Sequence, residues 1–283
     1  MDQITIRKAN LQSAMDVVLS HIESLSYPLD SWLEDALAGS EIYVFIDCTS
    51  VVGYCAAKER VLQFFYVLPS AYRYAPALFE RTVKDLQIEK AMVMTQDRQM
   101  CALIAEWEID MLRLGCWFTD SGEEVQNDSI AQSADLRTAE QGDTKRIREA
   151  SGDFFDETSG GFTSLEERVD AQTIFVLERG GEMLGCGIIE AGLLCRDYVS
   201  IGMFVCPVHR QKGVAKTILL HLKKKVYARG GKPIAGCWYY NTLSRRALES
   251  AGMICTALGY EAILKGKDKP PKRTGNPPGE LVE

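Results

Sequence analysis

Residues 199–229, VSIGMFVCPVHRQKGVAKTILLHLKKKVYAR, decide the fold of this chain. The stretch opens with an apolar run at 199–205, which predicts a strand, and Cys206 and Pro207 end that run. A short loop follows, and from Val214 onward the apolar residues recur at helical spacing. The stretch therefore predicts a strand, a tight loop that contains glycine, and a helix, in that order.

The loop between this strand and helix is suited to binding an anion. The first N–H groups of a helix have no partner within the helix and lie at the positive end of its dipole, so they can hold a phosphate. Gly213 has no Cβ and lets the backbone approach a ligand, and Ala215 keeps that approach open. Residues 207–232 include eight lysines and arginines, the last of them Lys232, and no acidic residue. We therefore expect a ligand that carries phosphate here, although the lysines at 223–225 would also suit a solvated helix face.

Residues 210–215, RQKGVA, resemble the (Arg/Gln)-x-x-Gly-x-(Gly/Ala) pyrophosphate loop of the GCN5-related N-acetyltransferase (GNAT) superfamily. The strand end Val-Cys-Pro at 205–207 resembles the family's V-x-P sequence before that loop. Residues 241–253, NTLSRRALESAGM, resemble its N-x-x-(A/S)…G-(F/M) helix, which closes over acetyl-coenzyme A. The resemblance covers about residues 135–264, with all elements in the family's order.

The order of the predicted elements repeats along the chain. In the first half we expect strands at 4–7, 41–47, 51–60, 61–68, 91–95 and near Trp117, and helices at 11–22, 75–86 and 99–114, the last capped by Gly115. In the second half we expect strands at 135–138, 173–178, 183–190, 199–205, 233–240 and 257–264, and helices at 142–150, after Gly213 and after Asn241. The repeat predicts an α/β (α+β) fold of tandem GNAT-like domains, each a mixed, mostly antiparallel twisted sheet flanked by helices.

We expect four segments along the chain. They are a degenerate GNAT-like domain at 1–120, a polar linker at 121–134, the acetyltransferase domain at 135–265, and an extended tail at 266–283 that is rich in Pro, Gly and charge. The first half is degenerate because its counterpart of the loop, residues 72–77 (YRYAPA), has no glycine, and Pro76 lacks a backbone N–H. We expect the first half to serve packing, acceptor recognition or pairing with the second half.

The resemblance implies that acetyl-CoA lies in a V between the strand ending near Val205 and the strand at 233–240. Main-chain groups of the first strand would bond the pantetheine arm and the thioester carbonyl, and N–H groups of the loop would hold the pyrophosphate. The helix after the second strand would bond the pantetheine from the other side. The residues that this places around acetyl-CoA are Met203, Phe204, Val205, Arg210, Gln211, Lys212, Gly213, Val214, Ala215, Asn241 and Ser244.

Direct acetyl transfer needs a base for the amine and a proton donor for the leaving thiolate. Many family members place a Tyr seven residues after the Asn, but Leu248 stands there in this chain. Tyr240 is our candidate for the donor, with Tyr239 as an alternative. Glu190, at the end of the preceding strand, is our candidate for the base; His209 and a chain of waters are the alternatives.

The acceptor is expected to be a primary amine of a small molecule or peptide, acetylated in a ternary complex. Residues 153–157, DFFDE, lie where the family builds its acceptor wall and would suit a cationic amine, although a plain loop explains them equally well. The alternative function is a non-catalytic sensor of acyl-CoA or a scaffold protein, which Leu248 and the degenerate first half favour.

The composition narrows the remaining classes. Three histidines and nine cysteines without a C-x-x-C pair argue against a metal site and indicate free thiols in a reducing compartment. The net charge of −7 argues against nucleic-acid binding. No apolar run reaches the about 18 residues of a membrane span, and no secretory signal is visible, so we expect a cytoplasmic protein. A homo-oligomer is compatible with the sequence. A dinucleotide enzyme is disfavoured because the glycine fingerprint is absent.

Overall fold

A computed structural model describes residues 4–107, 109–127, 131, 133–152, 154–155 and 164–266. The elements of the first half are β1 (Ile4–Ala9), α1 (Met15–Ser24), α2 (Ser31–Ala38), β2 (Glu41–Asp47), β3 (Ser50–Lys58), β4 (Val61–Val67), α3 (Ala75–Asp85), β5 (Lys90–Met94), α4 (Arg98–Ala105) and β6 (Met111–Asp120). Those of the second half are β7 (Asp135–Thr138), α5 (Thr144–Ser151), α6 (Leu165–Asp170), β8 (Ile174–Arg179), β9 (Glu182–Ala191), β10 (Tyr198–Val205), α7 (Val214–Ala228), β11 (Lys232–Trp238), α8 (Thr242–Ser250) and β12 (Met253–Ile263).

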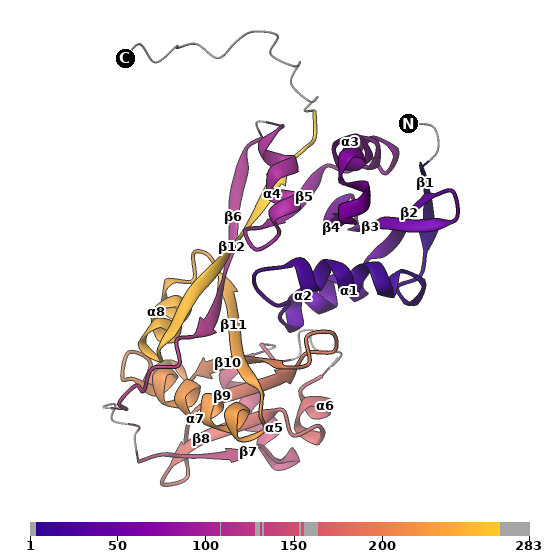
Figure 1. The fold of residues 1–283 in the computed structure, drawn as a ribbon. Coiled ribbons are helices and arrows are strands. Elements are labelled where there is room, and N and C mark those ends of the chain that lie inside the picture. Colours follow the sequence, from indigo (N-terminus) through magenta and orange to yellow (C-terminus); the bar gives the residue numbers. More distant parts are fainter. Residues whose placement is uncertain are drawn as a thin grey trace, which may run out of the picture.

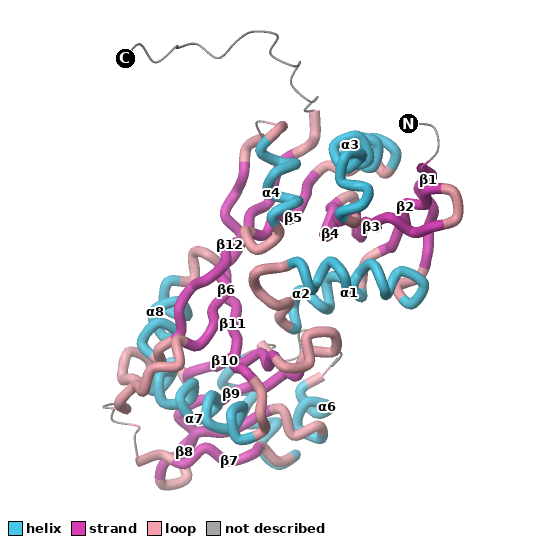
Figure 2. Tube along the Cα trace, viewed as in Figure 1, coloured by secondary structure: helices cyan, strands magenta, loops and turns pink. Residues whose placement is uncertain are grey.

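The two halves repeat one order of strands and helices, as the sequence indicates. Within the described residues, all twelve strands join one sheet in the order β1-β2-β3-β4-β5-β12-β6-β11-β10-β9-β8-β7. Two pairings among these strands are parallel, β4 with β5 and β10 with β11, and the others are antiparallel. The expected mixed, mostly antiparallel sheet flanked by helices is confirmed (Figures 1 and 2).

The last strand of each half lies in the sheet of the other half. β12 pairs with β5 of the first half, for example Tyr260 opposite Val93. β6 pairs with β11 of the second half, with Thr119 opposite Ile234. β6 and β12 also pair with each other and run side by side between the two halves (Figure 1). The two sheets are therefore joined into one by an exchange of strands, which the sequence analysis did not foresee.

The helix expected at 99–114 is wrong in its second part. α4 ends at Ala105, and Leu114 and Gly115 lie in β6. Gly115 is no helix cap: a Cβ at this position would lie 2.8 Å from the Trp117 ring, so glycine makes room for the indole. β6 gains strand partners on both edges, and this pairing outweighs the helical spacing that we read from the sequence. α2 and α6 are helices that the sequence analysis missed.

The parallel strands β10 and β11 diverge after a short paired stretch. Their register runs from Tyr198 opposite Lys232 to Ser200 opposite Ile234. β10 then continues along β9 as far as Val205, whereas β11 continues along β6. The sheet therefore opens between the two strands, at the place where the sequence predicts the V that receives acetyl-CoA.

α7 is held close to the sheet by a glycine of β9. An added Cβ at Gly187 would lie 2.9 Å from side-chain atoms of both Ile218 and Leu222 of α7. Both of these residues are fully buried, together with Val214 at the helix start. This packing fixes the start of α7, and the loop before it, against the end of β10. Among the described residues, no helix is both long enough and apolar enough to span a membrane.

Candidate active site

A cavity of about 370 Å³ lies where β10 and β11 diverge. Four residues singled out in the sequence line it: Met203 on β10, Asn241 and Ser244 at the start of α8, and Glu190 on β9. Leu248, which replaces the tyrosine of the family motif, lines it too and is buried. The structure therefore brings together residues from four strands, β6, β9, β10 and β11, and from the helices α2 and α8 around one cavity, as an active site requires.

The predicted phosphate loop, residues 210–215, follows β10 after a 3-10 turn at Pro207–His209, and α7 begins within it, directly after Gly213. Gly213 has φ of +77°, a left-handed conformation that favours glycine. Gln211, with φ of +60°, is left-handed as well, so the loop turns sharply and its side chains are exposed. Arg210 Nε donates to the carbonyl oxygen of Val205 (3.3 Å), which holds the basic side chain against the end of β10. Lys212 Nζ donates to the Val208 carbonyl (2.9 Å).

Not every predicted cofactor residue lines the cavity. Phe204 and Val205 end β10 beyond Met203, and the loop through Gly213 to Ala215 follows them, all outside the cavity lining. This is the arrangement expected if the cavity receives the reacting end of a long cofactor and the loop its phosphates. Asn241 caps α8: its Oδ1 accepts from the Ser244 N–H (3.1 Å).

Glu190 is buried in a network of charged and polar side chains. It forms an ion pair with Arg168 of α6, and only 7% of Glu190 and 1% of Arg168 are exposed. Ser31 Oγ donates to Glu190 Oε2 (2.7 Å), and the Ser31 N–H donates to Ser200 Oγ (3.0 Å). Ser31 belongs to α2, so a residue of the first half forms a hydrogen bond with Glu190, the predicted base, which belongs to the second half.

Asp30 and Trp32 also line the cavity, and the sequence analysis missed both. Asp30 caps α2 by accepting from the Leu33 N–H (2.9 Å), and its other oxygen accepts from Trp117 Nε1–H (2.8 Å). Burial raises the pKa of Asp30 to about 6. An Asp followed by a short amphipathic run is a helix-start signal, so Asp30-Ser31 could have revealed α2.

The other candidates for proton transfer lie elsewhere. Tyr240 is 73% exposed, packs edge-on against the Tyr239 ring (5.2 Å), and is absent from the cavity lining. His209 lies in the turn after β10, and its Nε2 is 3.0 Å from Oε1 of Glu182 on β9. In the predicted acceptor wall Phe154 lines the cavity and Phe155 is buried, whereas residues 153, 156 and 157 lie outside the described part of the chain.

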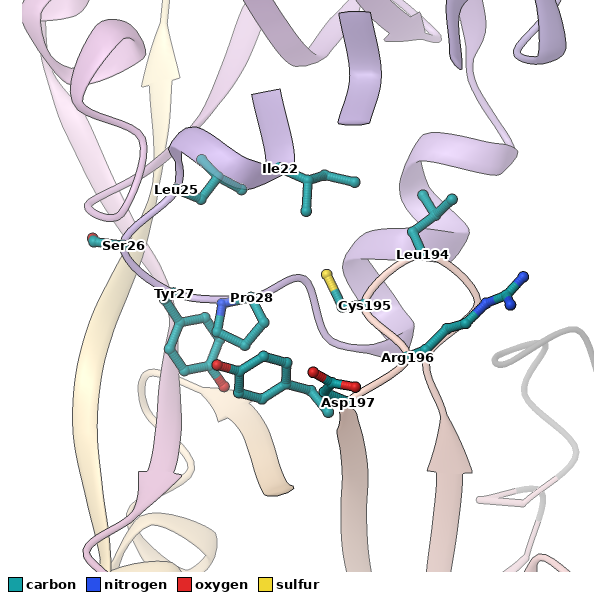
Figure 3. Close-up of a pocket in the computed structure, with 10 residues that line it drawn as sticks. Ile22, Leu25, Ser26, Tyr27, Pro28, Leu194, Cys195, Arg196 and Asp197 are labelled. Atoms are coloured by element: carbon teal, nitrogen blue, oxygen red, sulfur yellow. The ribbon is translucent and has the colours of Figure 1, made fainter. Parts of the chain in front are cut away.

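A second hollow, of about 420 Å³, lies between the two halves (Figure 3). Ile22 and Leu25 come from the first half and face Leu194 and Cys195 of the loop between β9 and β10. Glu34 of α2 holds this loop, because its carboxylate accepts from the N–H groups of Leu193, Leu194 and Cys195. None of the predicted site residues lines this hollow.

In the first half, hydrogen bonds within the chain occupy the place that corresponds to the predicted cofactor site. Val67 stands two residues before Pro69, as Val205 stands before Pro207. The Val67 N–H donates to Gln99 Oε1 (2.8 Å), and Gln99 Nε2 donates to the Val67 carbonyl (3.2 Å). A carboxamide of the protein thus bonds the main-chain groups that a pantetheine amide would need. A 3-10 helix, Pro69–Tyr74, replaces the glycine loop.

We therefore predict that one chain binds one equivalent of coenzyme A. Titration calorimetry should give a stoichiometry near one, and Gln99→Ala should leave it unchanged because the 3-10 helix still lacks a phosphate loop. A stoichiometry near two, or a second site created by Gln99→Ala, would show that the first half retains a cofactor site.

Across the described residues, no group of three or more His, Cys, Asp or Glu side chains is arranged to hold a metal ion. The chemistry available in the cavity is that of two carboxylates, Asp30 and Glu190, with serine hydroxyls, a thiol and indole rings around them.

Comparison with known proteins accounts for both halves. A family model described as "Acetyltransferase (GNAT) domain" matches residues 10–121, and one described as "Acetyltransferase (GNAT) family" matches residues 138–253. No curated protein matches the chain.

Solved structures share the fold over nearly the whole length. A GNAT-family acetyltransferase from Colwellia psychrerythraea has a TM-score of 0.80 at 16% identity, covering 92% of this chain and 99% of that one. A GCN5-related N-acetyltransferase from Sphaerobacter thermophilus has a TM-score of 0.61 at 15% identity, with 95% and 98% covered. A tandem GNAT protein from the clavulanic acid biosynthesis pathway has a TM-score of 0.60 at 11% identity, with 94% and 100% covered. The chain therefore belongs to the GCN5-related N-acetyltransferase superfamily and carries two of its domains in tandem.

Proposed function

We propose that this protein is an N-acetyltransferase that moves the acetyl group of acetyl-CoA to a primary amine within a ternary complex. Its family supports acyl transfer in general. The observation that carries the proposal is the cavity between the diverging strands β10 and β11, together with the left-handed loop that connects β10 to α7. The residues assigned to acetyl-CoA are Met203, Phe204, Val205, Arg210, Gln211, Lys212, Gly213, Val214, Ala215, Asn241 and Ser244.

In this proposal the cofactor residues act through their main chain and charge. N–H groups from Gln211 to Ala215 bind the pyrophosphate, because they lie in the loop and the first turn of α7, where N–H groups have no partner within the helix. Arg210 and Lys212 add positive charge. Met203 bonds the thioester end, and Asn241 and Ser244 bond the pantetheine arm from α8.

The reaction needs no covalent intermediate on the protein. The amine nitrogen attacks the thioester carbonyl carbon, the new C–N bond forms, and the C–S bond breaks with release of the CoA thiolate. Glu190 accepts the proton that the amine loses, either directly or through Ser31, whose hydroxyl it already binds. Tyr240 is predicted to protonate the thiolate. It lies outside the cavity lining, so the structure does not support this role directly.

The proposal predicts that the protein releases CoA thiol from acetyl-CoA when a suitable primary amine is added. The measurement is thiol release with a panel of amines, with the acetylated product identified by its mass. Glu190→Gln should lower kcat by about 10²- to 10⁴-fold, as loss of a general base does. Because this change also removes the negative charge that faces Arg168, activity is counted per mole of CoA bound.

The second candidate is a non-catalytic sensor or scaffold that binds acyl-CoA. Leu248 favours it, because an apolar side chain lines the cavity where many family members have a tyrosine. Tight CoA binding without thiol release on any amine would favour the sensor over the enzyme.

A further inference from the structure

Three indole rings gather at the cavity, and they come from both halves of the chain. Trp32 lies at the start of α2, Trp117 on β6 and Trp238 at the end of β11, and all three line the cavity. The ring centroid of Trp32 lies 6.1 Å from that of Trp117 and 5.9 Å from that of Trp238. Trp32 is 38% and Trp238 59% exposed, whereas Trp117 is buried. We call these three rings the indole cage.

The indole cage carries a buried negative charge. Trp117 donates to Asp30, and β11 passes so close that a Cβ on Gly236 would lie 2.8 Å from Asp30 Oδ2. Asp30 and Glu190 are the charged residues in the cavity lining, which includes no lysine, arginine or histidine among the described residues. Arg168 compensates the charge of Glu190. The charge of Asp30 has hydrogen-bond donors around it but no basic side chain in the lining.

The indole cage adjoins the predicted reaction centre. The Asn241 N–H donates to the carbonyl oxygen of Trp238 (2.9 Å), so the cage continues directly into the helix start assigned to the pantetheine arm. A group bound by the cage would therefore belong to the acceptor and lie within the length of a small molecule from the acetyl group.

Aromatic faces and a carboxylate in one partly desolvated space select for positive charge. A cation is attracted to the negative face of an indole, most strongly where water is excluded. A neutral group of equal size gains only its apolar contact. An anion would be repelled by the negative potential of the indole faces and by the carboxylate of Asp30.

We propose that the acceptor is a cationic amine, in which the amine to be acetylated is joined to a second positive group. The inference rests on the transferase function proposed above and names its substrate class: diamines, polyamines, and amines that carry a quaternary ammonium group. The second group sits against Trp32, Trp117 and Trp238 with Asp30 as its counter-charge. The first half of the chain thus supplies acceptor recognition, because it contributes Asp30, Trp32 and Trp117.

The test compares two pairs of matched probes on the full chain. The first pair is choline and 3,3-dimethylbutan-1-ol, which have the same shape and differ in charge. Calorimetry should show that choline binds about tenfold or more tightly than its neutral counterpart. The second pair is 1,4-diaminobutane and butylamine, each as acceptor with acetyl-CoA. The diamine should have the higher kcat/KM, by a similar factor.

Variants locate the effect. Trp32→Leu keeps an apolar side chain without an aromatic face and should reduce both preferences to less than about twofold, whereas Trp32→Phe should retain part of them. Tyr72→Leu removes an exposed aromatic ring outside the cavity and should change neither preference. Trp32 is partly exposed, so these changes should not prevent folding.

The outcomes separate this inference from the proposed function. Choline titration needs no acetyl transfer, so selective binding without thiol release would uphold the indole cage and overturn the transferase. Equal kcat/KM for the diamine and butylamine, with normal turnover, would uphold the transferase and overturn the cage. Equal affinities for choline and 3,3-dimethylbutan-1-ol, or no detectable binding of either, would also overturn the cage. So would a preference for the charged probe that Trp32→Leu leaves unchanged.

Discussion

We expect Gly213→Glu to abolish coenzyme A binding while the chain stays folded. The change places bulk and a negative charge at the start of α7, where the N–H groups are assigned to the pyrophosphate. It therefore opposes the attraction between helix start and phosphate directly. The left-handed backbone at this position (φ +77°) costs a Glu about 1–2 kcal/mol, which is small beside the stability of a domain. Titration calorimetry should show a loss of affinity of at least about a hundredfold, a change of about 3 kcal/mol.

Gly230→Glu is the matched control for this experiment. Gly230 is also left-handed (φ +77°), has open space around it, and lies between α7 and β11, at the far end of α7 from the loop. It imposes the same side chain, charge and backbone strain, so circular dichroism should show both variants folded. Only Gly213→Glu should lose the cofactor. An affinity that survives Gly213→Glu, or that falls equally in Gly230→Glu, would contradict the phosphate loop.

We expect Arg168→Met to lower the free energy of unfolding by about 3–5 kcal/mol. Arg168 and Glu190 are both buried and paired, and removing one partner leaves the other charge without its main compensation. Arg168 also donates to the Phe155 carbonyl oxygen (3.0 Å), so the substitution frees a second buried acceptor. Urea unfolding followed by circular dichroism measures the loss.

A double variant isolates the charge effect. Arg168→Met with Glu190→Gln removes both charges, so it should be more stable than Arg168→Met alone by about 1 kcal/mol or more. Arg60→Met, at the exposed pair with Glu89, should change stability by less than about 1 kcal/mol. Additive effects of the two substitutions at 168 and 190 would show that this pair does not stabilise the site.

The sequence predicts those parts of the fold that depend on local signals. The apolar run before Pro207, the glycine at 213 and the helical spacing after it recur in the structure as β10, a left-handed turn and α7. The same holds for most strands, because alternating or continuous apolar residues are read within a few positions of each other. The degenerate loop of the first half follows equally from its missing glycine and from Pro76.

The indole cage and the strand exchange depend on contacts between distant residues. Nothing near Asp30 in the sequence says that its carboxylate meets Trp117, 87 positions away. The periodicity of β6 shows that it is apolar, but not which strand it pairs with, because the partner depends on the whole sheet. Because strand partners cannot be read from the local sequence, residues 106–114 were wrongly predicted to be helical. The sequence alone therefore did not predict that residues of the first half line the cavity.

Exchange of β6 and β12 has a consequence for anyone who divides this gene. Cutting the chain between β6 and β7 would leave β5 in the first fragment and β11 in the second fragment each with an unpaired edge, which invites aggregation. The two products would recover their shape only by meeting in solution, as the pieces of a split reporter do. The same exchange of strands would result if the genes for two subunits of a homodimeric ancestor had fused. The boundary between the two halves would then correspond to the former subunit interface.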